Sequence, residues 1–297
     1  MRPGGYQQIV GLIQFTERFP DEEACHKYLF SRRWPDGYAC PRCGGRIYSF
    51  VSTRGLYQCR YCRYQVSVTA GTVMEKTRTP LRVWFWMMFL IANQKTGVSI
   101  LGASRMLGIS YKRAWLIAHR IRSAMESRDK NYKLSGVVEL DDAYFGAKGK
   151  PGKRGRGAGG KTPVLVAVSV DGDRPGYASM RVMPNLSVPE IQKATEDMIE
   201  EGSTVITDGF IAYTLALTGF DHKVKVIHDP KTASKKLPWV HILIANVKGA
   251  LRGVQHGVSP PRLQDYLSES CWRFSRRWKE GELFDRLLWS CVSCTCT

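Results

Sequence analysis

The stretch GVVELDDAYFG, residues 136–146, combines an apolar pattern with three acidic side chains. Its Val, Leu, Tyr and Phe residues favour a β-strand, a setting in which acidic side chains are depleted. Side chains alternate along a strand, so Glu139 and Asp141 share one face and Asp142 lies on the other. The stretch therefore predicts a strand whose carboxylates need an explanation.

The segments that follow predict a mixed α/β domain around this strand. Residues 187–202 have the pattern of a helix, with Ser187 as its N-cap and Glu190 completing a capping box. Further helices are expected towards the end of the chain. Three apolar stretches bounded by turn residues predict strands: TPVLVAVSVDG (162–172), YASMRVMP (177–184) and STVITDGF (203–210).

Asp208 is predicted at the end of the last of these strands, where sheets of this class commonly place their ligands. Carboxylates that meet at adjacent strand ends suit Mg²⁺ or Mn²⁺, which prefer oxygen ligands. In phosphodiester chemistry, two such ions about 4 Å apart activate the attacking oxygen and stabilise the leaving one. The alternative is that Asp141 and Asp208 only cap turns and helices, and spacing alone leaves both possibilities open.

Two Cys-x-x-Cys pairs lie near the start of the chain, in CPRCGG (40–45) and CRYC (59–62). Zinc takes four tetrahedral ligands, and a two-residue gap lets each pair present both thiolates to one ion. The alternating segment YSFVSTRGLYQC (48–59) predicts a hairpin between the pairs. This layout predicts a zinc ribbon with one structural zinc ion. Its ligands would be Cys40, Cys43, Cys59 and Cys62. Four free cysteines in a small core are the alternative, but little other apolar material is present there.

A helical segment follows the cysteines. The apolar run VWFWMMFLIA (83–92) is about half as long as a membrane span and predicts a buried helix. Residues 99–125 predict a helix to Leu107, a turn, and a second helix capped by Ser110, which is typical of a helix-turn-helix. A plain helical hairpin is the alternative. Four basic residues are expected on the outer face of the second helix, where they suit contacts with DNA phosphates: Lys112, Arg113, Arg120 and Arg122.

The chain is strongly basic, with 44 Lys and Arg residues against 26 Asp and Glu residues and a formal net charge of +18. Such an excess favours a nucleic-acid partner, although a basic protein that is merely soluble is the alternative. The segment AKGKPGKRGRGAGGK (147–161) predicts a basic loop suited to a phosphate backbone. Neither a secretory signal nor a membrane span is recognisable, so a reducing cytoplasmic location at the nucleoid is expected, without a membrane partner. The cysteine-rich segment 290–297 is expected to be a frayed tail.

The zinc-ribbon and helix-turn-helix patterns precede VELDDAYFG (138–146), VITDGFIAY (205–213) and the block 237–277. In this order they resemble a bacterial insertion-sequence transposase of the DDE superfamily, in the subgroup with an N-terminal zinc ribbon. The resemblance implies a ribonuclease H-like catalytic domain with Mg²⁺ or Mn²⁺, which cleaves and joins double-stranded DNA at element ends and target sites. It also implies a homo-oligomer in the DNA complex. The first two aspartates of the family pattern fall on Asp141 and Asp208.

The expected fold class is α+β and multidomain. A zinc ribbon is predicted over residues 1–70, a helix-turn-helix-like segment over 71–130 and a ribonuclease H-like domain of mixed α/β type over 131–297.

The third acidic residue of the family pattern is missing, and PWVHILIANVK (238–248) stands in its place. Members of this group use Asn or His in that role, followed by a Lys. A helix that begins at Pro238 places His241 and Lys248 on one face, because they are seven residues apart, while Asn246 points away from both. This geometry favours His241 as the third catalytic residue and Lys248 as a DNA contact. The alternative is that His241 caps the helix and Asn246 is the catalytic residue.

Three functions are compatible with these patterns. The first is a transposase that binds terminal inverted repeats, cleaves phosphodiester bonds and joins the freed 3′-hydroxyl to target DNA. The second is a zinc-ribbon DNA-binding protein without catalysis, descended from such an enzyme. The third is a nuclease that uses the same metal site without strand transfer.

Overall fold

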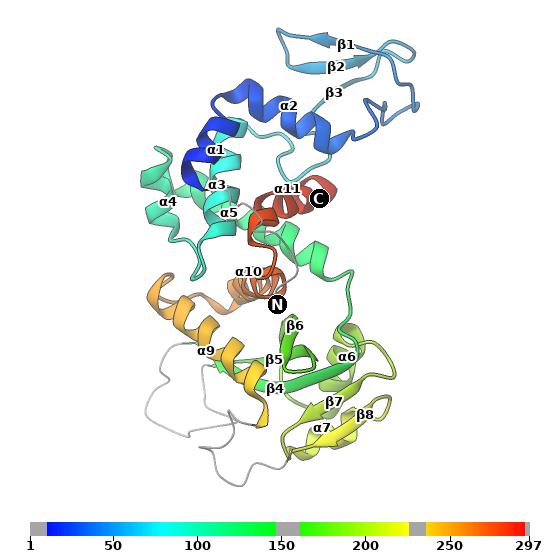
Figure 1. The fold of residues 1–297 in the computed structure, drawn as a ribbon, viewed down its shortest axis with the longest axis vertical. Helices are drawn as coiled ribbons and strands as arrows, with labels where there is room; N and C mark the ends of the chain where they lie inside the picture. The colour runs from blue at the N-terminus through cyan, green and yellow to red at the C-terminus, as the bar shows by residue number, and fades with distance from the viewer. Residues whose placement is uncertain (1–10, 147–160, 226–235, 295–297) are drawn as a thin grey trace, which may run out of the picture. The chain divides into compact units, whose positions relative to one another are not determined.

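The computed structural model describes residues 11–146, 161–225 and 236–294, so most of the basic segment 147–161 lies outside the described residues. The chain divides into two compact units (Figure 1). The first comprises Met1–Asn93, Ile100–Ala124 and Lys279–Thr297, and the second comprises Gln94–Ser99 and Met125–Trp278. Among the described residues, no helix is long and apolar enough to cross a membrane.

Helices make up most of the first unit, and aromatic rings form much of its core. Phe15, Phe19 and Phe85 pack with Phe284, with ring centroids 5.0 Å apart between Phe15 and Phe284 and 4.9 Å apart between Phe19 and Phe85. The helices are α1 (Leu12–Arg18), α2 (Glu22–Arg33), α3 (Leu81–Asn93), α4 (Ile100–Met106), the larger part of α5 (Tyr111–Asp129) and α11 (Leu283–Ser293), which follows the short η3 (Glu280–Glu282).

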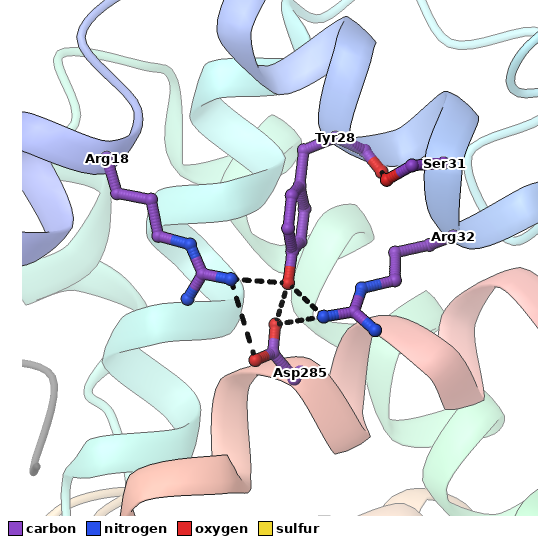
Figure 2. Close-up of polar contacts among 5 residues, drawn as sticks. All are labelled: Arg18, Tyr28, Ser31, Arg32 and Asp285. Carbon is purple, nitrogen blue, oxygen red and sulfur yellow. Dashed lines mark hydrogen bonds and ion pairs between the residues drawn. The ribbon is translucent and has the colours of Figure 1, made fainter. Parts of the chain in front are cut away.

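The last helix, α11, belongs to this unit although it comes after the second unit in the sequence. Figure 2 shows its Asp285 accepting a hydrogen bond from the hydroxyl of Tyr28 on α2, which itself accepts hydrogen bonds from Arg18 and Arg32 at 2.6 and 2.5 Å. The expectation of a frayed cysteine-rich tail is therefore wrong as far as Ser293. Cys291 is fully buried there, because the apolar face of α11 completes the helical core.

A small antiparallel sheet packs against α2. Its strands are β1, β2 and β3, and Tyr57 of β2 lies at the centre of an aromatic cluster with Phe30 and Trp34, at centroid distances of 4.9 and 5.5 Å. The predicted hairpin is present, with Tyr48 paired to Cys59 and Val51 to Leu56. The strands span β1 (Tyr48–Val51), β2 (Leu56–Cys59) and β3 (Gln65–Ser67).

The predicted pair of helices joined by a tight turn is also present. Gly108 takes a positive φ of 61°, and Ser110 caps α5 by accepting a hydrogen bond from the backbone N–H of Arg113 at 3.4 Å. The expectation that Arg120 and Arg122 lie on the outer face is wrong. Arg120 donates to the backbone carbonyls of residues 73 and 75, and Arg122 is buried, because α5 is packed on more than one side.

The second unit contains a five-stranded sheet in the order β6-β5-β4-β7-β8 (Figure 1). The first strand of the unit, β4, lies in the middle, antiparallel to β5 and parallel to β7. This order and these directions are those of the ribonuclease H-like fold. The strands are β4 (Val137–Phe145), β5 (Thr162–Asp171), β6 (Arg174–Val182), β7 (Thr204–Thr207) and β8 (Asp221–Val224).

Helices cover both faces of this sheet. One core lies between the sheet and α6 with α7, where Val138 and Leu140 of β4 are fully buried. The other lies between the sheet and α9 with α10, and contains Ala143 and Phe145 of the same strand. The helices span α6 (Val188–Met198), α7 (Ile211–Ala216), α9 (Pro238–Gly253), η2 (Pro260–Arg262) and α10 (Leu263–Arg276).

The start of α6 and the grouping of the chain into units both differ from the sequence-based expectations. Ser187 is the N-cap residue of α6, but its side chain makes no capping hydrogen bond, so the predicted capping box is wrong. The backbone N–H of Ser187 instead donates to Asn185 at 2.9 Å, which gives the chain a different turn before the helix. The ranges 1–70, 71–130 and 131–297 stay a prediction, while the compact units group residues 279–297 with the N-terminal part.

Candidate active site and metal centre

Asp141 lies in the middle of β4, and Asp208 follows the neighbouring parallel strand β7. Val137 of β4 pairs with Thr204 of β7 and Glu139 pairs with Ile206, so Asp141 and Asp208 each follow the last of these paired residues by two positions. Asp141 is buried, with 8% of its surface exposed, and Asp208 follows directly after the last residue of β7. The topology therefore brings the two predicted aspartates to one edge of the sheet.

The buried Tyr213 lies close to the three aspartates Asp141, Asp142 and Asp208. The hydroxyl of Tyr213 on α7 donates to Asp142 at 3.1 Å. Burial raises the pKa of Tyr213 well above its usual value, and the negative charges of Asp142, Asp141 and Asp208 raise it further. Asp208 also accepts a hydrogen bond from the backbone N–H of Phe210 at 3.0 Å, which shapes the turn into α7.

His241 reaches the same place from α9. Its Nε2 lies 3.8 Å from Oδ2 of Asp141, too far for a hydrogen bond. This nitrogen is buried and has no hydrogen-bond partner among the described residues. Burial lowers the pKa of His241, and the positive charge of Lys248 also lowers it while Asp208 opposes the change. Burial therefore favours the neutral imidazole, the form that keeps a nitrogen lone pair.

Lys248 and Asn246 occupy different sides of α9. Lys248 is half-buried, with its Nζ 5.3 Å from the ring centre of Phe145. Burial lowers the pKa of Lys248, as do the charges of Lys161 and Arg252, whereas Asp141 raises it. Asn246 is exposed. Lys248 also lines a shallow hollow along α9, together with Ala245, Gly249, Arg252 and Gly253.

Glu139 has a structural role that the sequence reasoning did not identify. It is 5% exposed, and its Oε2 accepts hydrogen bonds from the backbone N–H groups of Trp239 and Val240 at 2.9 and 3.0 Å. Burial raises the pKa of Glu139, and these two N–H groups and Lys225 lower it. A signal was present in the sequence, because a helix beginning at Pro238 has unpaired N–H groups that need an acceptor.

The chemistry of this edge fits a hard divalent cation. Carboxylate oxygens from two strands suit Mg²⁺ or Mn²⁺, and Mn²⁺ also accepts imidazole. Two ligand atoms each about 2.1 Å from a shared ion lie at most about 4.2 Å apart, and the 3.8 Å between His241 Nε2 and Asp141 Oδ2 is within that limit. The buried Nε2 of His241, which has no hydrogen-bond partner among the described residues, is also consistent with a bound ion.

The four predicted cysteines form a second candidate metal site, in the first unit. The sulfur atoms of Cys40, Cys43, Cys59 and Cys62 all lie within 4.8 Å of one another, and the pairs Cys40–Cys62 and Cys43–Cys59 are 3.6 Å apart. Tetrahedral zinc with bonds of about 2.3 Å places its sulfur ligands about 3.8 Å apart. The observed spacing therefore fits a zinc ion.

Backbone N–H groups favour the thiolate form of two of these cysteines. Burial by itself would raise the pKa of Cys40, but the N–H groups of Arg42 and Cys43 outweigh it and lower that pKa to about 6. The N–H groups of Cys62 and Tyr61 lower the pKa of Cys59 against the effect of burial. The N–H group of Gly45 lowers the pKa of Cys43, but the neighbouring thiols of Cys62, Cys59 and Cys40 and burial outweigh it and raise that pKa to about 12.

Comparison with known proteins identifies two regions of the chain. Residues 133–275 match the family described as the ISXO2-like transposase domain, and residues 20–65 match the transposase zinc-ribbon domain. The first range contains Asp141, Asp208 and His241, and the second contains all four cysteines. No sequence among curated proteins matches.

Two solved structures show a distant likeness. The chain in the Mos1 strand transfer complex is 14% identical to this chain, and the match covers 75% of this chain and 81% of that one with a TM-score of 0.30. The Mos1 transposase paired-end complex with the left transposon end gives 12% identity, 71% and 82% coverage and a TM-score of 0.28. At these values neither likeness bears on the roles of individual residues.

The two family matches together cover more than half of the chain, which belongs to the ISXO2-like transposases with an N-terminal zinc ribbon.

Proposed function

We propose that this chain is a metal-dependent DNA transposase. It binds the terminal inverted repeats of an insertion sequence, cleaves phosphodiester bonds there and joins the freed 3′-hydroxyl to target DNA. The observation that carries the proposal is the 3.8 Å approach of His241 to Asp141, with Asp208 close enough for its charge to act on both Tyr213 and His241. Family membership supports it, because the range matched to the transposase domain contains all three residues.

Each of these side chains has a distinct part in the proposal. Asp141 and Asp208 provide the carboxylate oxygens that hold Mg²⁺ or Mn²⁺. A divalent ion bound there supplies positive charge to the phosphoryl oxygens and lowers the pKa of an attacking water. His241, whose buried Nε2 lies 3.8 Å from Asp141, serves as a third ligand or orients the attacking water. Lys248, on the same side of α9 as His241, binds a phosphate of the DNA strand that enters the site.

Double-stranded DNA is the proposed partner, at the element ends and at the target. The net charge of +18 supports this, because Lys and Arg contacts release counterions condensed on the phosphates. The start of α5 presents exposed Tyr111, Lys112, Arg113 and Leu116, which suits contacts in a DNA groove. A homo-oligomer in the DNA complex completes the proposal.

The cysteine cluster is proposed to hold one structural zinc ion. Its contribution is folding free energy for the small sheet and no chemistry, since all four tetrahedral positions are filled by cysteine.

The proposal is tested with full-length protein and a labelled DNA fragment that carries the inverted repeats flanking its coding sequence. We expect nicked and joined products in the presence of Mg²⁺ or Mn²⁺. Asp208→Asn should abolish both products while end binding remains, because the DNA-binding elements lie elsewhere in the chain. Glu200→Gln, an exposed acid elsewhere in the second unit, is the matched control and should cleave normally.

The outcomes separate the three functions. Binding of the ends without any cleavage would favour a DNA-binding protein without catalysis. Cleavage without joined products would favour a nuclease. Normal cleavage by Asp208→Asn would show that the catalytic site has been assigned to the wrong residues.

A further inference from the structure

We infer that Glu139 is a positioning residue, which places His241 beside Asp141 by holding the first turn of α9. The inference rests on the proposed function, in which His241 acts at the metal site. It concerns a residue whose side chain points to a helix terminus and has no assigned part in the reaction.

The contact joins two segments about a hundred residues apart in the chain. Glu139 and Asp141 lie on the same face of β4, and this face packs against α9. The single oxygen Oε2 of Glu139 accepts from both Trp239 and Val240, and the next residue of the helix is His241. One carboxylate therefore fixes the two residues that immediately precede the imidazole.

The start of α9 has no local substitute for this acceptor. Its N-cap residue is Leu237, which has no side-chain oxygen, and Pro238 has no N–H. The first four N–H groups of a helix have no partner within the helix, and an anionic acceptor there also interacts favourably with the helix dipole. Glu139 thus takes the part that a local Ser, Thr, Asn or Asp has in most helices.

Holding the first turn sets the rotation of the helix about its axis. A side-chain atom about 5 Å from the axis moves about 2 Å when a helix rotates by about 20°. The Nε2 of His241 is 3.8 Å from Oδ2 of Asp141, so a movement of that size would separate a shared ion from one of its two ligands. Misplacement by about 1 Å is enough to reduce a rate by about 100-fold.

The same geometry argues against Glu139 as a metal ligand. Oε2 already accepts two charge-assisted hydrogen bonds of ordinary length. Glu139 is paired with Ile206, two residues before Asp208, and it lies two residues before Asp141 on β4.

The test is a double-mutant cycle in the full-length protein, measured as single-turnover cleavage of labelled element ends. Glu139→Ala should lower the rate about 100-fold. Because Glu139 acts through His241, the double variant Glu139→Ala, His241→Ala should be no slower than His241→Ala alone. Glu139→Gln keeps a side-chain oxygen that can accept both N–H groups, and it should recover much of the lost rate. The inference would be overturned if the rate losses of the two single variants multiplied in the double variant, or if Glu139→Ala cleaved at the normal rate.

A second measurement does not depend on activity. Amide hydrogen exchange at Trp239 and Val240 should become at least 10-fold faster in Glu139→Ala and stay slow in Glu139→Gln. The affinity for Mn²⁺, measured by calorimetry, should fall in Glu139→Ala by as much as it falls in His241→Ala. Unchanged exchange at the two amides would refute the inference even if the wild-type protein cleaved no DNA.

The control is Val247→Ala, which removes a buried side chain from the same helix. It should lower the melting temperature by an amount similar to Glu139→Ala but change the cleavage rate only a few-fold. If equal losses of stability gave equal losses of rate, Glu139 would have only a structural role. Absence of cleavage by the wild-type protein would count against the proposed function, whereas the exchange experiment would still decide the role of Glu139.

Discussion

At the scale of single residues, His241 is half-buried whereas Asn246 is exposed. The two are candidates for the same catalytic role, and they are five residues apart on α9. The imidazole of His241 has a buried nitrogen near Asp141, and burial lowers its pKa. Asn246 is exposed on another side of the helix. The position of Asp141 therefore favours His241 for the proposed role.

Substitution of each residue should separate the two possibilities. His241→Ala is expected to lower end cleavage by at least about 100-fold, since it removes a group next to the reacting atoms. His241→Glu should restore part of this activity, because a carboxylate binds Mg²⁺ better than imidazole does. Asn246→Ala should change the rate by less than about 10-fold. End binding, measured in parallel, should be unchanged in all three variants, and the reverse ranking of rates would move the site to Asn246.

Among the structural elements, the small three-stranded sheet is the one that carries the cysteine cluster. Its strands are three to four residues long, and an isolated sheet of this size has little stability. On one side it packs through Tyr57 against aromatic rings of α2. The cysteine cluster joins the turn before β1 to the end of β2 and the turn after it, so bound zinc would add the cross-link that the apolar contacts do not provide.

Replacement of one cysteine should remove this cross-link. We expect about one zinc ion per wild-type chain and none in Cys59→Ser, measured by elemental analysis of purified protein. The variant should also lose part of its near-ultraviolet circular dichroism, because the packing of the aromatic cluster becomes less regular. Cys25→Ala is a matched control, since Cys25 is buried in α2 outside the cluster, and it should retain zinc. A wild-type protein without zinc would contradict the assignment.

In the whole molecule, the two compact units are not consecutive in the sequence, because the first unit includes residues that follow the second. The first unit contains the cysteine cluster and the α4–α5 pair, but its core is completed by α11 from the end of the sequence. Phe284 packs with Phe15, Phe19 and Phe85, and Asp285 bonds to Tyr28 (Figure 2). The proposed DNA-binding part is therefore complete only when residues that follow the second unit have been added.

Phe284→Ala in the full-length protein should test this dependence. Loss of a buried phenylalanine costs about 3–5 kcal/mol of unfolding free energy, because a cavity remains. We expect zinc release and loss of end binding at a lower temperature, since both belong to the first unit. Trp289→Ala on the same helix removes a side chain that is 43% exposed and should leave both transitions near their wild-type temperatures. Equal behaviour of the two variants would show that α11 does not support this unit.

Local patterns in the sequence were sufficient to predict a large part of this structure. Alternation predicted β4 and placed Glu139 and Asp141 on one face, and the spacing of four cysteines predicted the cluster. The start of α9 at Pro238 was also predicted. These features depend on backbone geometry and on residues close together in the chain, so a period of two or of 3.6 residues reveals them.

Contacts between distant segments were decided by the tertiary structure alone. The pairing of Glu139 with the start of α9, the burial of Arg122 and the return of α11 to the first unit have no local pattern. The sequence showed that α9 lacks a capping side chain at Leu237, but it did not show which acceptor would replace it. A helix terminus can be satisfied by any group that packing brings near it, and a charged residue can be buried wherever its partners are. Such choices depend on how all the elements pack together, because the free energy of each contact includes the burial and ordering of its neighbours.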